Sequence, residues 1–478
     1  MLTAAALSAA PFAAFAQSPL SPTPMADQPA LHVPSAPAAP TPAKAPAPAA
    51  STKEAAAPAA KKTTAAKPAA APRRKAAEHK RERIVRKRRR RVYTPRNEIA
   101  LSDDPTPALQ PNTFYATAKA SERYLHIADA GGWPRVPRDL RPGSRGPAVA
   151  ALRRRLAMVG DLPTDQGWGE HWSRALTEAV KHFQFRMGLR RTGIVAGATL
   201  RALNVPANVR FKQLASTAQR LAGINFPFGD KYVVVNIPSL AVDAVQNGRV
   251  VHRYAAIVGE IDHQSPRLST KIVAINLNPT WTVPKSIIKN EIIPKMRRDP
   301  HYLSREHIRI LNYQGQEINP RSINWDSDKA TNYILRQDSG AGNALGRIRL
   351  NMPNSQAVYM HDTSSRYLFA KEFRFLSHGC VRVQGVYDLA AWLLQGTPVT
   401  DATPAKDSSL YDPDPRPAPS GGAWTAKLIQ EQIATGARET IQLVKPTPVI
   451  WVYMTGWASD DGTVHFRNDV YNIDTVGG

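Results

Sequence analysis

One short run of residues combines the groups that nucleophilic acyl transfer needs. Cys380 is the only cysteine in the 478-residue chain, and His361 precedes it by nineteen positions. A free thiol has a pKa of about 8.5, so it needs a neighbouring base to act as a nucleophile at neutral pH. A histidine within hydrogen-bond reach can take that proton, and a third group can orient the histidine. We therefore assign Cys380 as the candidate nucleophile and His361 as the candidate base.

The flanking sequence predicts elements that could bring these two side chains together. Residues 356–361 are typical of a strand, and residues 386–394 predict a helix with an apolar side. Between them, Gly379 suits a sharp bend in the backbone. The main-chain amides around Gly379 and Cys380 are candidate donors to an oxyanion, with Arg382 nearby. A lone cysteine is often only a small buried hydrophobe, but here polar and glycine positions crowd the thiol.

The pattern of His361, then Ser377-His378-Gly379-Cys380, an apolar residue and Arg382 resembles the active-site signature of the L,D-transpeptidases, which have the YkuD fold. Arg382 stands where many members have asparagine, and this form resembles the large periplasmic branch typified by YcbB. Five further stretches agree with that branch: 234–238, 257–259, 278–284, 343–346 and 352–354. With gaps, the resemblance extends from about residue 98 to 474.

The resemblance implies roles for the residues around the thiol. Asp362 would orient His361 through its main-chain carbonyl. An oxyanion and substrate-contacting set would comprise Ser377, His378, Gly379, Arg382, Tyr359, Trp281 and Asn343. Tyr359 and Trp281 could equally be core residues. No metal and no cofactor is expected.

The resemblance also implies a substrate. The donor would be a tetrapeptide stem of peptidoglycan, from which D-alanine leaves, and the acceptor would be the diaminopimelate amine of a second stem. The expected product is a 3-3 cross-link, although attachment of a lipoprotein and exchange of D-amino acids stay open. Peptidoglycan stem peptides and glycan are therefore the expected partners.

Composition and charge indicate where such a protein works. The net charge of +25 favours anionic partners, and a single cysteine excludes an intramolecular disulfide. Residues 1–16 resemble the apolar region and cleavage site of a signal peptide, although the usual basic region before it is missing. Either the true start lies upstream or this run is an Ala-rich tail. We expect export to the periplasm, with no transmembrane span apart from the signal.

Ten of the net positive charges lie within residues 73–91, in an Ala/Pro-rich and polybasic segment that extends from 17 to 97. A segment of this composition cannot build a core and is predicted to be disordered. The basic run indicates contacts with anionic envelope components or lipid headgroups. Nucleic acid is an unlikely partner, because the run has no interleaved aromatic residues.

The remaining sequence predicts a multidomain α+β protein with a mostly β YkuD-type catalytic domain. The expected parts are a helical scaffold (98–139 and 207–228), a three-helix peptidoglycan-binding-like domain (140–206), the catalytic domain (229–400), a loop (401–422), and a C-terminal helix and hairpin that complete the catalytic domain (423–478). The three-helix domain is identified by resemblance, since its helical spacing alone indicates only a small bundle. A basic segment at about 285–340 would form a helical lid over the site.

Particular residues distinguish the transpeptidase interpretation from other interpretations of the chain. In a sortase the cysteine and arginine lie far apart, whereas here Cys380 and Arg382 are two positions apart. A non-catalytic envelope anchor would not depend on Cys380, and a nucleic-acid binder would depend on residues 73–91. His171 and His182 could be imagined as metal ligands, but single structural histidines are the favoured interpretation. Four acidic residues near the C-terminus are interpreted as turn formers: Asp460, Asp461, Asp469 and Asp474.

Overall fold

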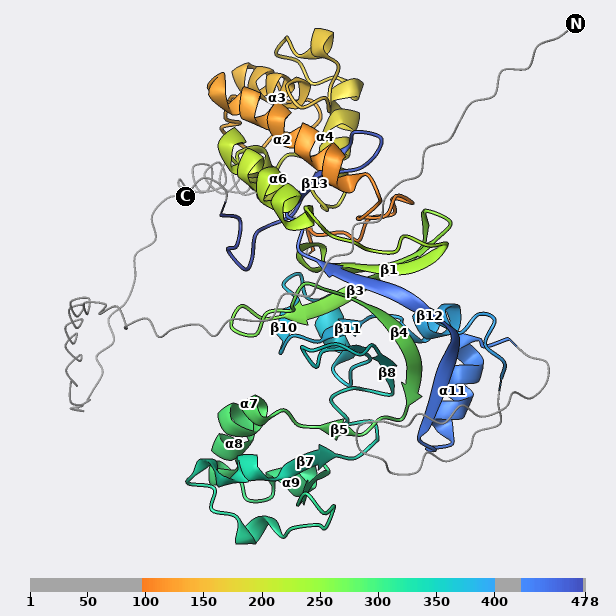
Figure 1. Ribbon diagram of the computed structural model, residues 1–478. Coiled ribbons are helices and arrows are strands. Elements are labelled where there is room, and N and C mark those ends of the chain that lie inside the picture. The colour runs from red at the N-terminus through yellow and green to blue at the C-terminus, as the bar shows by residue number, and fades with distance from the viewer. Residues whose placement is uncertain (1–96, 400–422, 476–478) are drawn as a thin grey trace, which may run out of the picture. The chain divides into compact units, whose positions relative to one another are not determined.

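The computed structural model describes residues 97–399 and 423–475, which contain a large sheet, a helical region and a smaller insertion (Figure 1). The predicted signal peptide, the polybasic run and the loop at 401–422 lie outside the described residues. Within the described ranges, no helix is both long and apolar enough to cross a membrane.

The large sheet has nine strands in the order β10-β3-β11-β9-β8-β4-β12-β1-β2, and β2 also pairs with β3. The sheet therefore closes on itself through β3, whose first half pairs with β2 and whose last residues pair with β11 and β10. The strands are β1 (Lys231–Asn236), β2 (Ala241–Gln246), β3 (Arg249–Gly259), β4 (Leu268–Leu277), β8 (Ile348–Asn351), β9 (Met360–His361), β10 (Phe375–Ser377), β11 (Val381–Val383) and β12 (Glu439–Val452). Closure fixes the register of the short strands that carry the candidate residues.

The core of this sheet is aliphatic and is covered by two helices. Every second residue of the strands faces inward, as the fully buried Val233, Val235 and Val381 show. Helix α10 (Val386–Leu393) adds Leu389 and Leu393 to the same core, and α11 (Ala426–Ala434) adds further apolar residues beside β12 (Figure 1). The predicted helices at 386–394 and 424–435 are thus confirmed.

The C-terminal strands differ from the expected hairpin. A helix and a hairpin that complete the catalytic domain are predicted for residues 423–478, but β12 is a long strand between β4 and β1. The hairpin is instead formed by β13 (Gly456–Ala458) and β14 (Val464–Phe466), which form a separate two-stranded sheet. Apolar side chains of this hairpin pack against the helical region. The prediction missed the extent of β12 because Pro446 and Pro448 lie inside it, and the strand accommodates them with a register shift between Gln442 and Thr447.

The helical region comprises α2 (Thr113–Asp129), α3 (Pro147–Ala157), the short 3-10 helix η1 (Thr164–Gln166), α4 (Arg174–Arg186), α5 (Gly197–Leu203) and α6 (Ala207–Leu221). The predicted apolar stripes are buried: Leu152, Leu156, Leu176 and Phe183 are fully inaccessible. Sequence signals also mark the helix starts. Pro147 occupies the first turn of α3, and the Ser173 side chain caps α4 by accepting a hydrogen bond from the Leu176 N–H.

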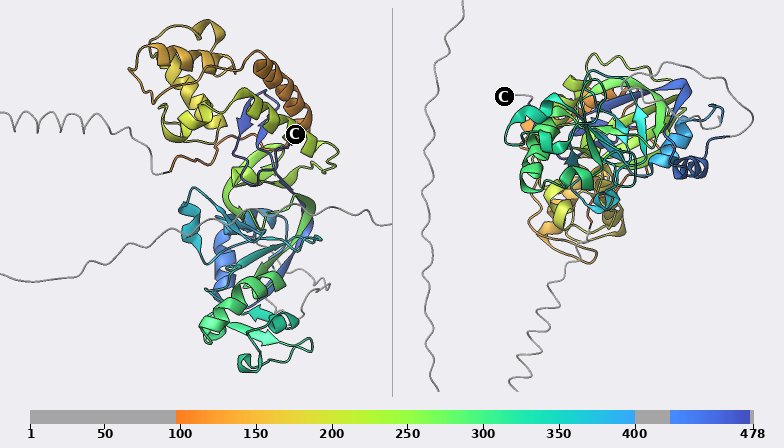
Figure 2. Two further views of the ribbon diagram at one scale, coloured as in Figure 1. Left: turned by 90° about the vertical axis from the view of Figure 1, so that its left-hand side faces the viewer. Right: turned by 90° about the horizontal axis from the view of Figure 1, so that it is seen from below.

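The insertion between β4 and β8 is built around a small sheet of its own. Its strands β5 (Trp281–Thr282), β7 (Ile334–Gln337) and β6 (Ile308–Leu311) pair in that order. Its helical elements are α7 (Lys285–Ile287), a π-helical turn η3 (Ile288–Ile292), α8 (Ile293–Arg298), α9 (Tyr302–Arg305), and the 3-10 turns η4 (Pro320–Ser322) and η5 (Asp328–Asn332). These elements stay grouped in both views of Figure 2 and share an apolar core that includes Ile288, Ile310 and Leu335.

Two sequence-based expectations for the insertion and its surroundings were wrong in detail. The segment at about 285–340, which was predicted to be helical, is α-helical only up to Arg305; β6 follows, and β7 lies within the rest. The predicted strand at 356–361 is reduced to Met360–His361. There the Asn354 side chain bonds the main chain of Gln356 and Val358, which captures the backbone in a turn.

Candidate active site

Strand register places the candidate base beside the strand that follows the candidate nucleophile. Strands β9 and β11 are parallel, with Met360 opposite Val381 and His361 opposite Arg382. Met360 and Val381 point into the core, so His361 and Arg382 point away from it. Cys380 immediately precedes β11, two residues before Arg382, so its main chain lies next to the strand that pairs with β9, and its half-buried side chain also packs against the core.

Two arginines flank His361 in a row across three strands. Arg349 of β8 is opposite His361, and Arg382 of β11 is opposite it on the other side. Burial lowers the pKa of both guanidinium groups, and the neighbouring Cys380 acts in the opposite direction on both. Arg349 bonds the Asn276 side chain at 2.9 Å, whereas the buried Nε of Arg382 has no partner among the described residues. This row of cations is suited to bind an anion.

Burial leaves the thiol and the imidazole both neutral. Burial raises the pKa of Cys380 to about 11, although the Tyr359 main-chain amide and the two arginines act against it. Burial and Arg382 lower the pKa of His361 to about 3, despite main-chain groups of Asp362 and Leu345 that favour the charged ring. A neutral imidazole can accept a proton, so His361 has the protonation state that a general base requires.

The turn that carries Cys380 is held by hydrogen bonds to its main chain. The Ser377 hydroxyl donates to the Cys380 carbonyl, and Gly379 has φ +103°, which favours glycine. The Ser265 hydroxyl donates to the Gly379 carbonyl at 2.7 Å and accepts from the Gly259 N–H at 2.9 Å. Within 97–399 and 423–475, the N–H groups of Gly379 and Cys380 bond no other main-chain carbonyl. They are therefore available as oxyanion donors.

Asp362 does not contact the imidazole through its carboxylate. Its side chain accepts hydrogen bonds from the Arg347 N–H at 3.0 Å and from Arg366 at 3.2 Å. Only the main chain of Asp362 acts on His361, where it raises the pKa of the ring. The His361 Nδ1 atom nevertheless makes no hydrogen bond of normal geometry to a described residue. Both observations are consistent with a main-chain group of Asp362 that lies near the His361 ring but is not well aligned for a hydrogen bond to Nδ1.

The other three candidate residues, Tyr359, Trp281 and Asn343, differ in how closely they contact His361. Tyr359 packs edge-on against His361, with ring centroids 5.7 Å apart. Burial raises the pKa of Tyr359, and a hydrogen bond from Trp281 in β5 partly offsets that effect. Asn343 is buried, but both ends of its side-chain amide bond the main chain of its own loop, at Asp338 and Leu345. Tyr359 and Trp281 thus join the insertion to the site, and Asn343 shapes the loop beside it.

His378 is among the residues predicted to contact the oxyanion or the substrate, but its acidic and imidazole neighbours were not predicted from the sequence. His378 Nε2 lies 3.0 Å from Glu291 Oε1 in the insertion, and its ring centroid is 4.6 Å from that of His263. Contact with Glu291 raises the pKa of His378, and the same contact lowers the pKa of Glu291 to about 2. The i,i+3 spacing of Glu260 and His263 was the available signal, but the partner Glu291 is far away in sequence.

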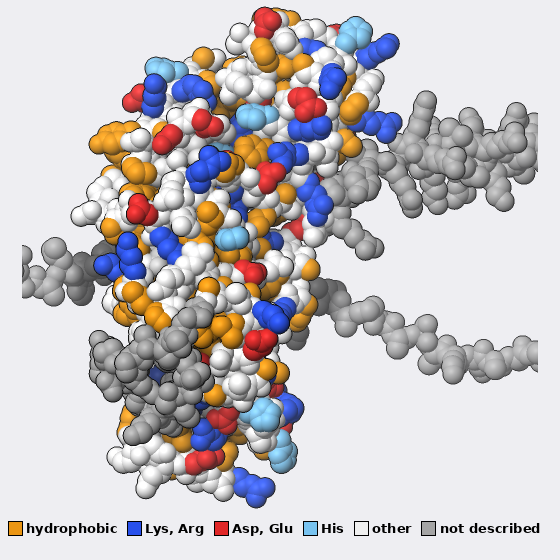
Figure 3. Space-filling model, turned by 90° about the vertical axis from the view of Figure 1, so that its right-hand side faces the viewer, with side chains coloured by type: hydrophobic (Ala, Val, Ile, Leu, Met, Phe, Trp, Pro, Cys, Tyr) orange, Lys and Arg blue, Asp and Glu red, His pale blue; other side chains and the backbone are white. Residues whose placement is uncertain are grey.

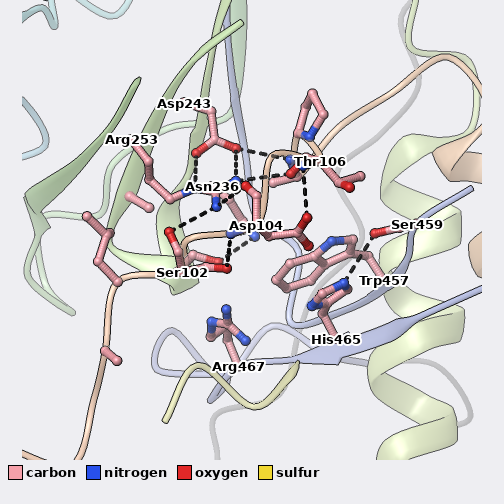
Figure 4. Close-up of a pocket in the computed structure, with 16 residues that line it drawn as sticks. Ser102, Asp104, Thr106, Asn236, Asp243, Arg253, Trp457, Ser459, His465 and Arg467 are labelled. Atoms are coloured by element: carbon pink, nitrogen blue, oxygen red, sulfur yellow. Dashed lines mark hydrogen bonds and ion pairs between the residues drawn. The ribbon is translucent and has the colours of Figure 1, made fainter. Parts of the chain in front are cut away.

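Two hollows among the described residues are lined by residues other than Cys380 and His361. A cavity of about 30 Å³ is lined by residues of the segment 100–108, β2, β3 and the β13–β14 hairpin (Figure 4). There Arg253 bonds Asp243 at 2.6 Å and three carbonyls of the segment, which is a structural link. A wider hollow of about 420 Å³ between β8, α10 and α11 is lined by Arg347, Arg366 and Tyr387. Neither includes Cys380 or His361.

Comparison with known proteins decides which family this sheet represents. Residues 230–400 match the family model YkuD, described as "L,D-transpeptidase catalytic domain". The chain carries a YkuD domain. Residues 145–203 match a second model, described as "Putative peptidoglycan binding domain", so the YkuD domain follows a peptidoglycan-binding helical region. The match to YkuD covers all the candidate residues at and around Cys380.

One curated relative matches about half of the chain. A "Putative L,D-transpeptidase" of Haemophilus influenzae is 31% identical over 264 residues, which are 55% of this chain and 48% of the relative. The chain thus spans about half the length of that curated relative.

Solved L,D-transpeptidases are more distant in sequence. The structure from Xylanimonas cellulosilytica is 17% identical over 67% of this chain and 100% of its own, with a TM-score of 0.19. The structure from Stackebrandtia nassauensis is 16% identical over 52% of this chain and 85% of its own, with a TM-score of 0.22. At these scores the superpositions carry no weight, and the assignment of the YkuD domain stands on the family model.

Proposed function

We propose that this chain is a periplasmic L,D-transpeptidase that forms 3-3 peptidoglycan cross-links through a Cys380 thioester. The observation that supports the proposal is the position of His361 between two cationic residues, Arg349 and Arg382, on strands next to the turn that carries Cys380. The YkuD match supports the reaction class, and the peptidoglycan-binding match supports the substrate. The activity, the substrate and the location are proposals for the whole protein.

In the first half-reaction, Cys380 Sγ attacks the carbonyl of the third residue of a donor stem. His361 takes the thiol proton as the C–S bond forms, because neither group is charged beforehand. The carbonyl oxygen becomes an oxyanion, which the free N–H groups of Gly379 and Cys380 would accept. His361 then gives its proton to the leaving amine, so that D-alanine departs and a thioester remains.

In the second half-reaction, the side-chain amine of another stem's diaminopimelate attacks the thioester. His361 accepts a proton from that amine, and the sulfur leaves and recovers a proton, which restores the thiol. The guanidinium groups of Arg349 and Arg382 favour anions throughout, because each lacks a carboxylate partner among the described residues. They would hold a stem carboxylate or stabilise the oxyanion.

The insertion would act as a lid in this reaction. It contacts the site at two points, since Trp281 reaches Tyr359 and Glu291 reaches His378. A lid that closes over a bound stem would exclude water, which would otherwise hydrolyse the thioester. Its π-helical turn, which carries Glu291, is an uncommon conformation that often occurs at functional sites.

The proposal is tested by incubating the purified protein with a carbapenem and, separately, with disaccharide tetrapeptides that contain diaminopimelate. Wild type should gain the mass of one carbapenem, Cys380→Ala should gain none, and His361→Ala should react roughly 10²–10⁴ times more slowly. His252→Ala is the matched control, because His252 is an exposed histidine of β3. An unshifted wild-type mass, under conditions where a known L,D-transpeptidase reacts, would contradict the proposal.

A further inference from the structure

Four side chains with metal-binding groups meet where the insertion contacts the Cys380 turn. Glu260 and His263 belong to the loop after β3, His378 to the turn itself and Glu291 to η3. One ligand atom from each of Glu260, His263 and His378 lies within 4.8 Å of the others. Glu291 Oε1 lies 3.0 Å from His378 Nε2. The set thus draws on three separate segments of the chain.

The spacing of these atoms matches a small coordination sphere. His263 Nδ1 lies 2.9 Å from Glu260 Oε1, and His378 Nε2 lies 3.8 Å from the same oxygen. Ligand atoms around a tetrahedral zinc ion lie about 3.3 Å apart, given bonds of about 2.0–2.1 Å to nitrogen and oxygen. The observed separations bracket that value. Small side-chain rotations would direct Glu260, His263 and His378 at one ion. Glu291 Oε1, which lies 3.0 Å from His378 Nε2, would move further to join them.

The backbone holds these groups close together without any ion. The Glu260 N–H donates to the Ser377 carbonyl at 2.8 Å, and the His263 N–H donates to the Glu260 carbonyl at 3.2 Å. Lys295 bonds the second oxygen of Glu291 at 3.0 Å, which leaves Oε1 directed at His378. The four side chains are each about one third to two fifths exposed, so an ion from solvent can reach them.

We propose that Glu260, His263, His378 and Glu291 form a reversible Zn²⁺ site that ties the insertion to the turn carrying Cys380. Two imidazoles and two carboxylates suit zinc, because imidazole is a preferred ligand of this ion and carboxylates complete a neutral site. The ion would replace the direct contact between Glu291 and His378 with two metal bonds. It would therefore hold η3 against the turn more firmly than that contact does.

The consequence for activity depends on the proposed function. If Cys380 is the nucleophile, zinc would slow its acylation, because an insertion held against the turn by the ion would restrict access to the thiol. The metal site itself does not depend on that function. The main competing explanation of zinc inhibition is direct binding of the ion to the Cys380 thiolate.

Calorimetric titration of the full-length, metal-free protein with Zn²⁺ separates the two explanations. Wild type, His252→Ala and Cys380→Ala should bind one ion with the same affinity. His263→Ala and Glu291→Gln should each bind it at least about tenfold more weakly, because removal of a ligand costs no less than loss of an outer-shell partner. Equal affinity of wild type and His263→Ala, loss of binding in Cys380→Ala, or no binding by wild type would each overturn the site.

Carbapenem acylation, followed by intact mass with and without zinc, gives the second readout. Zinc should slow acylation of the wild type and leave the His263→Ala rate unchanged. Without zinc, the His263→Ala rate should equal the wild-type rate, because His263 is outside the set assigned to acyl transfer. Equal slowing of both proteins by zinc would overturn the tie between insertion and turn. Absence of acylation in metal-free wild type would contradict the proposed function alone, since the calorimetric result is independent of it.

Discussion

The proton on Cys380 is held by burial, and this makes the thiol's reactivity unusually dependent on pH. With a pKa of about 11, only roughly one thiol in 10⁴ is ionised at pH 7. The alkylation rate with iodoacetamide should therefore rise roughly 100-fold between pH 7 and pH 9, without a plateau. Measurement by intact mass, with glutathione as the reference thiol, checks this. A rate that levels off below pH 9 would contradict a half-buried thiol that is neutral at pH 7.

The positive charge of Arg382 should make that thiol more acidic. Arg382→Gln removes a cation that lowers the pKa of Cys380, so alkylation at pH 9 should become several-fold slower. Arg321→Gln is a suitable control, because Arg321 is exposed in the insertion. The same rate in Arg382→Gln and wild type would show that the guanidinium does not act on the sulfur.

Ser265 is expected to hold the Cys380 turn in its shape. Ser265→Ala leaves the buried Gly379 carbonyl and the Gly259 N–H without their partner, which costs about 1–3 kcal/mol of unfolding free energy. Carbapenem acylation should slow, because the oxyanion donors, the N–H groups of Gly379 and Cys380, would shift when the Gly379 carbonyl loses its partner. Urea denaturation and acylation kinetics measure the two effects, with the exposed Ser269→Ala as control. An unchanged acylation rate would limit Ser265 to a structural role.

At the residue scale, the sequence predicted the groups that share a motif and missed those that meet only in the fold. Cys380, His378 and Arg382 are adjacent in the chain, so their association follows from spacing alone. Arg349 reaches His361 only through the pairing of β8 with β9. Glu291 reaches His378 only through the folded insertion. Such contacts depend on strand register, which a single sequence does not specify here.

The insertion is the element whose role can be tested most directly by deletion. Strands β5 and β7 pair, and the Val283 N–H bonds the Leu335 carbonyl, so the ends of the insertion lie side by side. Residues 284–334 can therefore be replaced by an Asn-Gly turn. Iodoacetamide alkylation of Cys380 at pH 8 should become at least about tenfold faster, as exposure brings the thiol pKa back toward its ordinary value.

The deletion is informative only if the sheet stays folded. Circular dichroism and a thermal melt of the shortened protein provide that control. A folded variant whose Cys380 is alkylated no faster than that of wild type would mean that the insertion does not cover the thiol.

At the element scale, helices were predicted more accurately than strands. Helices α3, α4 and α6 each show an apolar stripe whose period identifies them in isolation. By contrast, β6 and β7 are four residues long and gain their stability from pairing with each other. The long β12 contains Pro446 and Pro448, which argue against a strand unless the register shift is known. The formation and extent of these strands depend on pairing with their neighbours rather than on the strand propensity of their own residues.

At the scale of the whole molecule, charge is distributed differently in the folded part and in the basic run. On the face shown in Figure 3, Lys and Arg side chains are interspersed with Asp and Glu rather than gathered in one patch. Much of the net charge comes instead from residues 73–91, which lie outside the described residues. The expectation that this run contacts anionic envelope components stays a prediction.

The helical region contains a buried ion pair that should make the folded protein sensitive to acid. Burial alone would raise the pKa of Asp161, but Arg186 and His182 together hold it below its ordinary value of 3.8. Arg186 contacts both carboxylate oxygens, at 2.6 and 2.5 Å. A lowered folded pKa means that the stabilisation is fully present above pH 3.8 and is lost as the pH falls through the folded value.

Asp161→Asn should remove this stabilisation at every pH. Arg186 would be left buried without a charged partner, which costs about 3–5 kcal/mol of unfolding free energy. Urea denaturation at pH 7 measures the loss, and Asp165→Asn is the matched control, since Asp165 is exposed in the same region. Equal stability of the two variants would show that the pair contributes little.

The closure of the nine-stranded sheet through β3 affects how the molecule behaves in a crowded compartment. Unpaired strand edges are templates on which other chains can add strands and aggregate. In this sheet β3 joins the two ends, and within 97–399 and 423–475 only the three-residue β10 is left at an edge. Destabilising substitutions in β2 or β3 would open the pairing between these two strands. Such variants should therefore form fibrils or precipitates more readily than equally destabilised variants with substitutions in other parts of the molecule.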